Sequence, residues 1–194
     1  CICDARRNMM YDRYNYFYKW GAFKMKIERI CPDETKNLYN CMNQIDSESQ
    51  FMLYAPDERS YNEETLRDNI KHNFYIGLKT DEGDIKGYSF VHISSVAKIK
   101  HIGYIITGIE NNYHHQGYAT QMFEEIIKWA KNKGLRRLEL TVLTHNNPAI
   151  KLYEKMGFKI EGIKRQSIYM DGLYHDELYM AMLLDESPET TLAF

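Results

Sequence analysis

The sequence predicts one α/β domain built around a mixed sheet, and three observations support this prediction. The 194 residues are enough for a domain with its own hydrophobic core. Segments that alternate between apolar and polar residues, as strands do, interleave with four segments that have helical spacing. The resulting order is roughly β α α β β β α β α β β, and strands interleaved with helices in this way are typical of the α/β class.

The first half of the chain is predicted to hold four strands and two helices. Residues 26–31 alternate as a strand, and a helix is expected over about 32–44. The spacing of Ser60 and Glu63 is that of a capping box, which predicts a second helix ending near Lys71. The other strands are expected at 74–78, 85–93 and 101–109, with a hairpin turn at 81–84.

The second half is predicted to hold two helices and three strands. Apolar residues from Ala119 to Ala130 fall at helical spacing, and Gly134 follows as a stop signal. The next helix is expected to start at Pro148 and end at Gly157, because proline favours the first helical position and glycine the position after the last. The strands are expected at 138–143, 158–168 and 177–184, with a turn at Asp171-Gly172 before the last one.

The domain is expected to span residues 25–185, between a leader at 1–24 and a tail at 186–194. The leader carries five basic and two acidic side chains and is rich in tyrosine. We interpret it as sequence outside the core fold, appended or poorly ordered. The alternative is a helix that packs on the domain or on a partner through its aromatic side chains.

The overall charge and the apolar runs exclude several classes of protein. The formal net charge is −2, so the chain lacks the basic footprint of a nucleic-acid-binding protein. No run of about 20 apolar residues is present, so no membrane-spanning helix is predicted. Four cysteines in a chain that can build its own core indicate a reducing compartment, and we expect the protein to be cytoplasmic.

The sequence predicts no metal site. It contains neither a Cys-x-x-Cys pair nor His-Glu-x-x-His, and the adjacent His114 and His115 are expected to point in different directions. Other signatures fail as well. There is no Gly-x-Gly-x-x-Gly, and the segment around Ser89 lacks the final glycine of a nucleophile elbow.

A turn that joins a strand to a helix is the first candidate site. It reads Tyr113-His114-His115-Gln116-Gly117-Tyr118-Ala119-Thr120. Such a turn presents unpaired backbone N–H groups at the positive end of a helix dipole, where phosphate oxygens bind. Gly117 matters because a Cβ atom there would hold a ligand away from the backbone. Taken alone, this signal is weak, since any strand-to-helix turn can carry a glycine.

A second segment, one strand further on, makes the turn more informative. It begins with Asn146-Asn147-Pro148-Ala149, continues through Tyr153 and ends with Gly157-Phe158. Together the two segments resemble the GNAT superfamily of N-acetyltransferases, of the bacterial single-domain type. The family's motifs are Arg/Gln-x-x-Gly-x-Gly/Ala and an Asn-x-x-Ala…Tyr…Gly-Phe helix. The resemblance extends from about Met25 to Leu184, and it implies a mixed, mostly antiparallel central sheet flanked by helices.

The resemblance implies acetyl-CoA as a co-substrate and no metal. The backbone from Gln116 to Thr120 is expected to hold the pyrophosphate. The pantetheine arm is expected to bind to the strand end near Ile109 and to contact Asn146. His114 stands where the family has Arg or Gln, but binding is expected to survive because backbone amides supply most of the contacts. The expected acetyl-CoA contacts are Ile109, His114, His115, Gln116, Gly117, Tyr118, Ala119, Thr120, Asn146, Ala149 and Tyr153.

Tyr153 matches the general acid of the family. A phenol has a reference pKa of about 10, so it stays protonated at neutral pH and can donate to a departing thiolate. The acceptor amine must arrive neutral, which requires a base or a water chain. The candidates are Glu110 at the end of the central strand and His101 at its start. The alternative is that both candidate bases are strand-end residues that face solvent, and that Tyr153 is a core residue.

We therefore expect transfer of an acetyl group from acetyl-CoA to a primary amine by direct attack in a ternary complex, since no cysteine lies in either motif. The alternative is a non-catalytic CoA-binding sensor or scaffold. The sequence does not decide whether the acceptor is a small-molecule amine or a peptide amine. It also does not decide whether the protein forms a homodimer, as is common in the family. Six acids around the loop after the first helix predict a cationic acceptor, unless they form a solvated face: Asp46, Glu48, Asp57, Glu58, Glu63 and Glu64.

Overall fold

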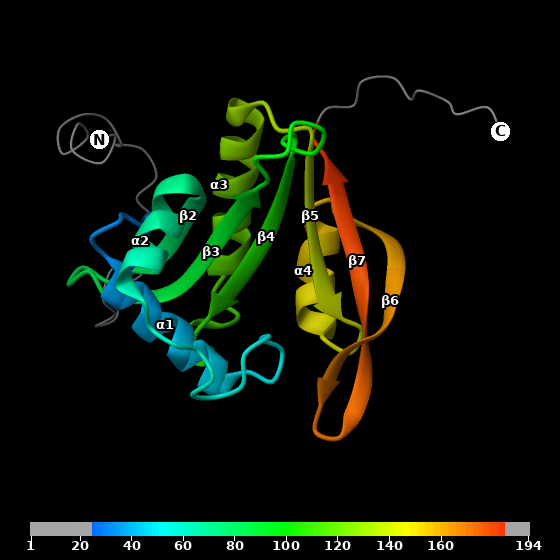
Figure 1. Cartoon of the computed structure of the whole chain (residues 1–194), viewed down its shortest axis with the longest axis horizontal. Coiled ribbons are helices and arrows are strands. Elements are labelled where there is room, and N and C mark those ends of the chain that lie inside the picture. The colour runs from blue at the N-terminus through cyan, green and yellow to red at the C-terminus, as the bar shows by residue number, and fades with distance from the viewer. Residues whose placement is uncertain (1–24, 185–194) are drawn as a thin grey trace.

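The computed structural model describes residues 25–184, and its elements follow the predicted order (Figure 1). The strands are β1 (Lys26–Arg29), β2 (Phe74–Lys79), β3 (Ile85–Ile93), β4 (Ile102–Ile109), β5 (Arg137–Leu143), β6 (Lys159–Met170) and β7 (Leu173–Leu183). The helices are α1 (Thr35–Glu48), α2 (Glu63–His72), α3 (Tyr118–Lys133) and α4 (Asn147–Lys155), with a short 3-10 helix η2 (Asn111–Tyr113). The predicted α/β class is therefore confirmed, whereas the expected leader and tail lie outside the described residues.

The strands of residues 25–184 form one seven-stranded sheet in the order β1-β2-β3-β4-β5-β7-β6. Neighbouring strands are antiparallel, except for the parallel pair β4 and β5. This pair is joined only between Ile102–Tyr104 and Arg137–Glu139, although β4 continues to Ile109 and β5 to Leu143. The two strands diverge beyond the paired residues, as Figure 1 shows. We call this opening in the sheet the fork.

Helices cover both faces of the sheet (Figure 1). On one face, α3 and α4 pack around buried side chains such as Phe123. On the other face, α1 and α2 pack around Leu38 and Tyr88. Gly108 of β4 belongs to this second face, because a Cβ atom built on it would lie 3.0 Å from Ile45 of α1. We call these the α3 face and the α1 face. No helix of the described part of the chain is long and apolar enough to span a membrane.

Several predicted boundaries differ from the structure by a few residues, and two of these differences have clear local reasons. Helix α2 is capped by Asn62, whose side chain accepts a hydrogen bond from the helix backbone, rather than by Ser60. Both residue types cap helices well, so the sequence alone could not separate them. Strand β7 begins at Leu173, not near Glu177, because pairing with β6 continues up to the turn, where Met170 faces Leu173.

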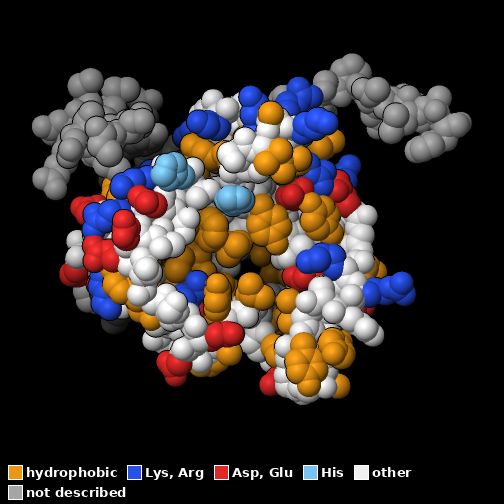
Figure 2. Space-filling model, viewed as in Figure 1, with side chains coloured by type: hydrophobic (Ala, Val, Ile, Leu, Met, Phe, Trp, Pro, Cys, Tyr) orange, Lys and Arg blue, Asp and Glu red, His pale blue; other side chains and the backbone are white. Residues whose placement is uncertain are grey.

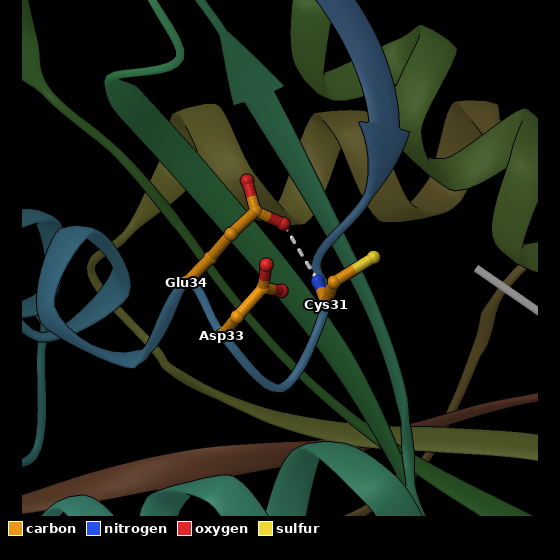
Figure 3. Close-up of side chains that lie close together, drawn as sticks. All are labelled: Cys31, Asp33 and Glu34. Carbon is orange, nitrogen blue, oxygen red and sulfur yellow. Dashed lines mark hydrogen bonds between the residues drawn. The ribbon is translucent and has the colours of Figure 1, made fainter. Parts of the chain in front are cut away.

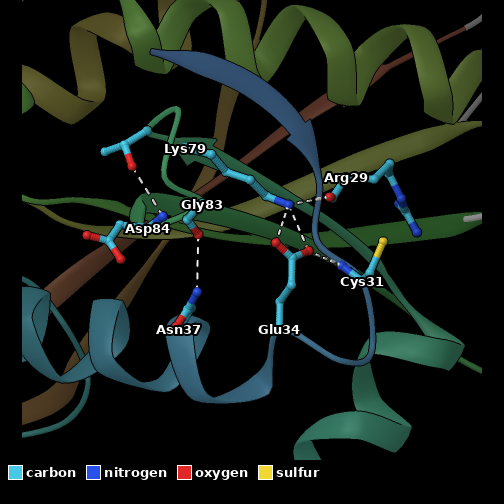
Figure 4. A network of polar contacts seen from close by, with 8 residues as sticks. Arg29, Cys31, Glu34, Asn37, Lys79, Gly83 and Asp84 are labelled. Atoms are coloured by element: carbon cyan, nitrogen blue, oxygen red, sulfur yellow. Dashed lines mark hydrogen bonds and ion pairs between the residues drawn. The ribbon is translucent and has the colours of Figure 1, made fainter. Parts of the chain in front are cut away.

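A buried ion pair ties the start of α1 to β2. Lys79 Nζ donates to the two carboxylate oxygens of Glu34 at 2.6 and 2.7 Å and to the Arg29 carbonyl at 2.8 Å (Figure 4). Glu34 also accepts a hydrogen bond from the Cys31 backbone N–H at 2.7 Å (Figure 3). Potential metal-ligating atoms of Cys31, Asp33 and Glu34 lie within 4.8 Å of one another. Because Lys79 already neutralises the Glu34 carboxylate, we assign this cluster to the structure of the turn.

Glu34→Ala is expected to lower the free energy of unfolding by about 3 kcal/mol, because it leaves the Lys79 ammonium without its counter-charge. The Lys79 side chain is only 8% exposed, so the ammonium has little bulk water around it to take the place of the carboxylate. The matched control is Asp68→Ala, which breaks a largely exposed pair with Lys71 and is expected to cost less than about 1 kcal/mol. Urea unfolding measures both values. Equal losses in the two variants would contradict a special role for the buried pair.

Candidate active site

The turn between β4 and α3 has the backbone geometry that a phosphate site requires. Gly117 is the N-cap of α3 and has φ +83°, a conformation that L side chains rarely adopt. A Cβ atom built on it would meet no protein atom within 4 Å, so the space in front of the backbone is open. No side chain caps the helix, and the first N–H groups, those of Tyr118, Ala119 and Thr120, have no partner within α3. The turn therefore fits a phosphate group.

Side chains of the turn bond to the end of β4 and to the 3-10 helix η2 that follows it. His114 Nε2 lies 2.7 Å from the carbonyl oxygen of Ile109. Gln116 Nε2 donates to the carbonyl of Asn112 at 2.9 Å. His115 has φ +59°, and its ring stands edge-on to that of His114 at 6.2 Å. The departure from the family motif at His114 thus provides a contact that shapes the turn.

The open edge of β4 offers backbone groups to a ligand. Backbone groups of a strand alternate between its two sides in an antiparallel ladder. The Glu110 N–H bonds to the Lys86 carbonyl in β3, so the backbone groups of residues 105, 107 and 109 point into the fork. His114 already engages the Ile109 carbonyl. The main-chain contacts with a ligand that we predicted near Ile109 can therefore use the Ile109 N–H group and the backbone groups of residues 105 and 107, but not the Ile109 carbonyl.

Across the fork, α4 begins at the predicted Asn146. Its Oδ1 accepts a hydrogen bond from the Ala149 N–H at 3.3 Å, which makes Asn146 the N-cap. Pro148 is therefore the second residue of the helix, whereas the sequence predicted that it would be the first. Because capping uses only the amide oxygen, the NH₂ group of Asn146 is left to donate to a ligand.

Tyr153 lies in the core of the α3 face, where its ring packs against Phe123 and Phe158 with centroids 5.4 and 6.2 Å apart. Burial raises the pKa of the Tyr153 phenol, and Tyr104 raises it further. The phenol is therefore neutral at physiological pH and holds a proton that it can donate. The geometry is compatible with both predicted roles, a core residue and a general acid.

The two predicted bases lie at opposite ends of β4. Glu110 is 8% exposed and lines a pocket of about 260 Å³, together with Asn37, Asn40, Cys41, Gln44, Asp84, Ile85 and Lys86. Burial raises the pKa of the Glu110 carboxyl, although Lys86 Nζ, 3.7 Å away, acts in the opposite direction. His101 is exposed and precedes β4, roughly 26 Å along the strand from Ile109. Glu110 thus follows β4 at the end that leads into the Gly117 turn, with its carboxyl in a pocket between α1 and β3, whereas His101 lies at the opposite end of the strand.

The α1 face of the fork holds side-chain contacts that the sequence did not predict. The Tyr104 hydroxyl lies 2.8 Å from Thr141 Oγ1 and links β4 to β5 where the fork opens. Phe51, from the loop between α1 and α2, packs against His145 with ring centroids 5.5 Å apart. Each pair joins segments that become neighbours only through the order of strands in the sheet. The one available signal was the alternation of β4, which puts Tyr104 on the same side as Gly108.

A family model described as the acetyltransferase (GNAT) family matches residues 38–158. The chain belongs to the GNAT family. The matched span includes the Gly117 turn, Asn146 and Tyr153. The L-amino acid N-acetyltransferase AaaT of Escherichia coli (strain K12) is 32% identical over 101 residues. These residues make up 52% of this chain and 62% of that relative, so the match spans less than two thirds of the relative's length.

Solved structures share the GNAT fold. A GNAT-family acetyltransferase from Streptococcus pneumoniae superimposes with a TM-score of 0.78 at 27% identity, covering 82% of this chain and 99% of the other. The protein yncA from Salmonella typhimurium, solved with acetyl-CoA, has a TM-score of 0.74 at 14% identity, covering 88% of this chain and 99% of the other. The predicted mostly antiparallel sheet flanked by helices is therefore confirmed.

Proposed function

We propose that this GNAT protein transfers the acetyl group of acetyl-CoA to a primary amine by direct attack in a ternary complex. The observation that carries the proposal is the open, positive-φ turn at Gly117, which leads directly into a fork with a free strand edge. Membership of the GNAT family supports the reaction type. The L-amino acid named for the Escherichia coli relative supports an amine acceptor.

Residues on both sides of the fork would hold acetyl-CoA. The N–H groups of Gly117 to Thr120 suit the pyrophosphate, because they are unpaired within the helix and lie at its positive end. The free edge of β4 suits the amide groups of the pantetheine arm, and the Asn146 NH₂ group can reach the same arm from α4. The thioester would then lie in the fork, between Tyr153 on the α3 face and the acceptor on the α1 face.

The chemistry requires one proton to leave the amine and one to reach the sulfur. The lone pair of the neutral amine attacks the thioester carbonyl carbon, and the C–S bond breaks as the amide forms. Tyr153 donates its proton to the leaving thiolate, and a proton released by the attacking nitrogen restores the phenol through water. A covalent intermediate on Cys41 is disfavoured, because burial raises the pKa of its thiol and the thiolate is the nucleophilic form.

An acceptor screen tests the proposal directly. Acetyl-CoA is incubated with the protein and a panel of amino acids, amino acid amides, polyamines and peptides, and free thiol and acetylated amine are measured together. We expect equal amounts of both products with at least one amine. Tight binding of CoA without thiol release for any amine would instead favour a sensor or scaffold role.

Glu110→Gln is expected to lower kcat/KM about 100-fold at neutral pH if this carboxylate accepts the proton of the amine. The wild type should lose activity as the pH falls through the raised pKa of Glu110, because the protonated carboxyl cannot act as a base. Protonation of the acceptor amine causes a loss of its own at low pH, so the variant should keep that loss and lack only the step at the pKa of Glu110. His101→Gln is the matched control and should keep the wild-type profile. A variant that still shows the step at the pKa of Glu110 would exclude Glu110 as the base.

A further inference from the structure

The loop between α1 and α2, residues 49–62, touches both sides of the fork on the α1 face. Met52 lies against β4, since its Cε is 3.5 Å from a Cβ atom built on Gly108. Phe51 packs against His145, and His145 packs against His175 of β7 with ring centroids 5.2 Å apart. Figure 1 shows this cyan loop reaching toward the end of β5. The loop therefore forms one wall of the acceptor side of the fork.

A buried ion pair fixes the position of this loop. Arg59 donates to both carboxylate oxygens of Asp46, at 2.6 and 3.2 Å, and the Asp46 side chain is 1% exposed. The Arg59 guanidinium carbon lies 4.2 Å from the centroid of the Tyr54 ring. The backbone carbonyl of Arg59 accepts a hydrogen bond from the Tyr39 hydroxyl of α1. Since desolvation offsets much of the attraction between buried charges, such a pair contributes geometry more than net stability. Here that geometry is the placement of the segment that carries Phe51.

Contacts of the nearby acids weaken the prediction of a cationic acceptor. Four of the six acids are already engaged: Asp46 by Arg59, Glu48 by the Asn111 N–H, Glu58 by the Ala55 N–H, and Glu63 by Arg67. The wall itself is apolar. Ile106, which alternation places on the same face of β4 as Gly108, is 37% exposed. Figure 2 shows a hollow near the centre of this face, surrounded by hydrophobic side chains.

We propose that Phe51, held in place by the Arg59–Asp46 ion pair, is a specificity-determining residue that selects acceptor amines with an apolar group next to the nitrogen. The inference rests on the proposed acetyl transfer and narrows its substrate class. An apolar substituent that enters the hollow leaves water and packs against the Phe51 ring, whereas a charged substituent would lose its hydration among the hydrophobic side chains that surround the hollow. Arg59 acts through the loop and is a positioning residue.

The test compares glycinamide and leucinamide, which share the same primary amine and differ in their apolar group. Phe51→Ala is expected to reduce kcat/KM for leucinamide about tenfold and to leave glycinamide within twofold. Leu53→Ala is the matched control, because Leu53 belongs to the same loop but is 74% exposed; both amines should stay within twofold. The affinity for acetyl-CoA, measured by calorimetry, should not change in either variant.

Arg59→Lys keeps the positive charge but cannot make the two-pronged contact with Asp46. It should lower the preference for leucinamide in the same direction as Phe51→Ala. A lower melting temperature with unchanged selectivity would overturn the positioning role of Arg59. Equal changes for both amines in Phe51→Ala, or a wild type without preference for leucinamide, would overturn the inference alone. A wild type that binds acetyl-CoA and acetylates neither these nor any other amine would overturn the proposed function as well.

Discussion

Tyr153→Phe is expected to slow acetyl transfer roughly 100-fold or more, while the affinity for acetyl-CoA and the melting temperature change little. The substitution keeps the ring that packs between Phe123 and Phe158 and removes only the hydroxyl. The environment that raises the pKa of the phenol also disfavours a bare thiolate next to it, because both anions would lose hydration. In the proposed mechanism, the leaving sulfur therefore takes its proton from Tyr153.

Single-turnover acetyl transfer is the measurement that decides the role of Tyr153, since slow product release can hide a slower chemical step in kcat. Tyr75→Phe is the matched control. It removes a hydroxyl from another buried tyrosine, which stacks on Phe90 in the core of the α1 face. In each variant the free energy of unfolding can fall by about 1 kcal/mol, the value of one hydrogen bond. Only Tyr153→Phe should slow acetyl transfer. A single-turnover rate within threefold of wild type would make Tyr153 a core residue.

Local signals in the sequence predicted the parts of the site that local structure determines. The Gly117 turn and the Gly134 stop each depend on a few neighbouring residues, and both lie where the sequence placed them; the start of α4 is one residue earlier than predicted, with Asn146 as its cap. Helix and strand order followed for the same reason, because periodicity is a property of one segment at a time. Errors were small where two good capping residues competed, as with Ser60 and Asn62.

Contacts across the sheet could not be predicted in the same way. The fork exists because β4 and β5 are neighbours that share only a short stretch of pairing, and nothing in either strand reports its partner. The same holds for the Tyr104–Thr141 bridge. A count of acids around the α1–α2 loop could not show that Arg59 folds back onto Asp46.

Gly117→Val is expected to weaken the binding of acetyl-CoA about 100-fold or more. Two effects combine at this position: the branched side chain enters the open space in front of the α3 N–H groups, and φ +83° is unfavourable for valine. Loss of two hydrogen bonds to a charged phosphate costs about 3 kcal/mol or more, which corresponds to at least a 100-fold change in Kd. Calorimetric titration with CoA measures it.

Backbone strain alone could mimic this loss, and the other end of α3 offers a control with the same strain. Gly134 has φ +80°, and a Cβ atom built on it would also meet nothing within 4 Å. It caps the carboxyl end of the helix, where the dipole repels phosphate. Gly134→Val should therefore destabilise the domain to a similar extent and bind CoA like the wild type. If both folded variants bind CoA equally well, the Gly117 turn does not hold the pyrophosphate, and the phosphate site must lie elsewhere along the fork.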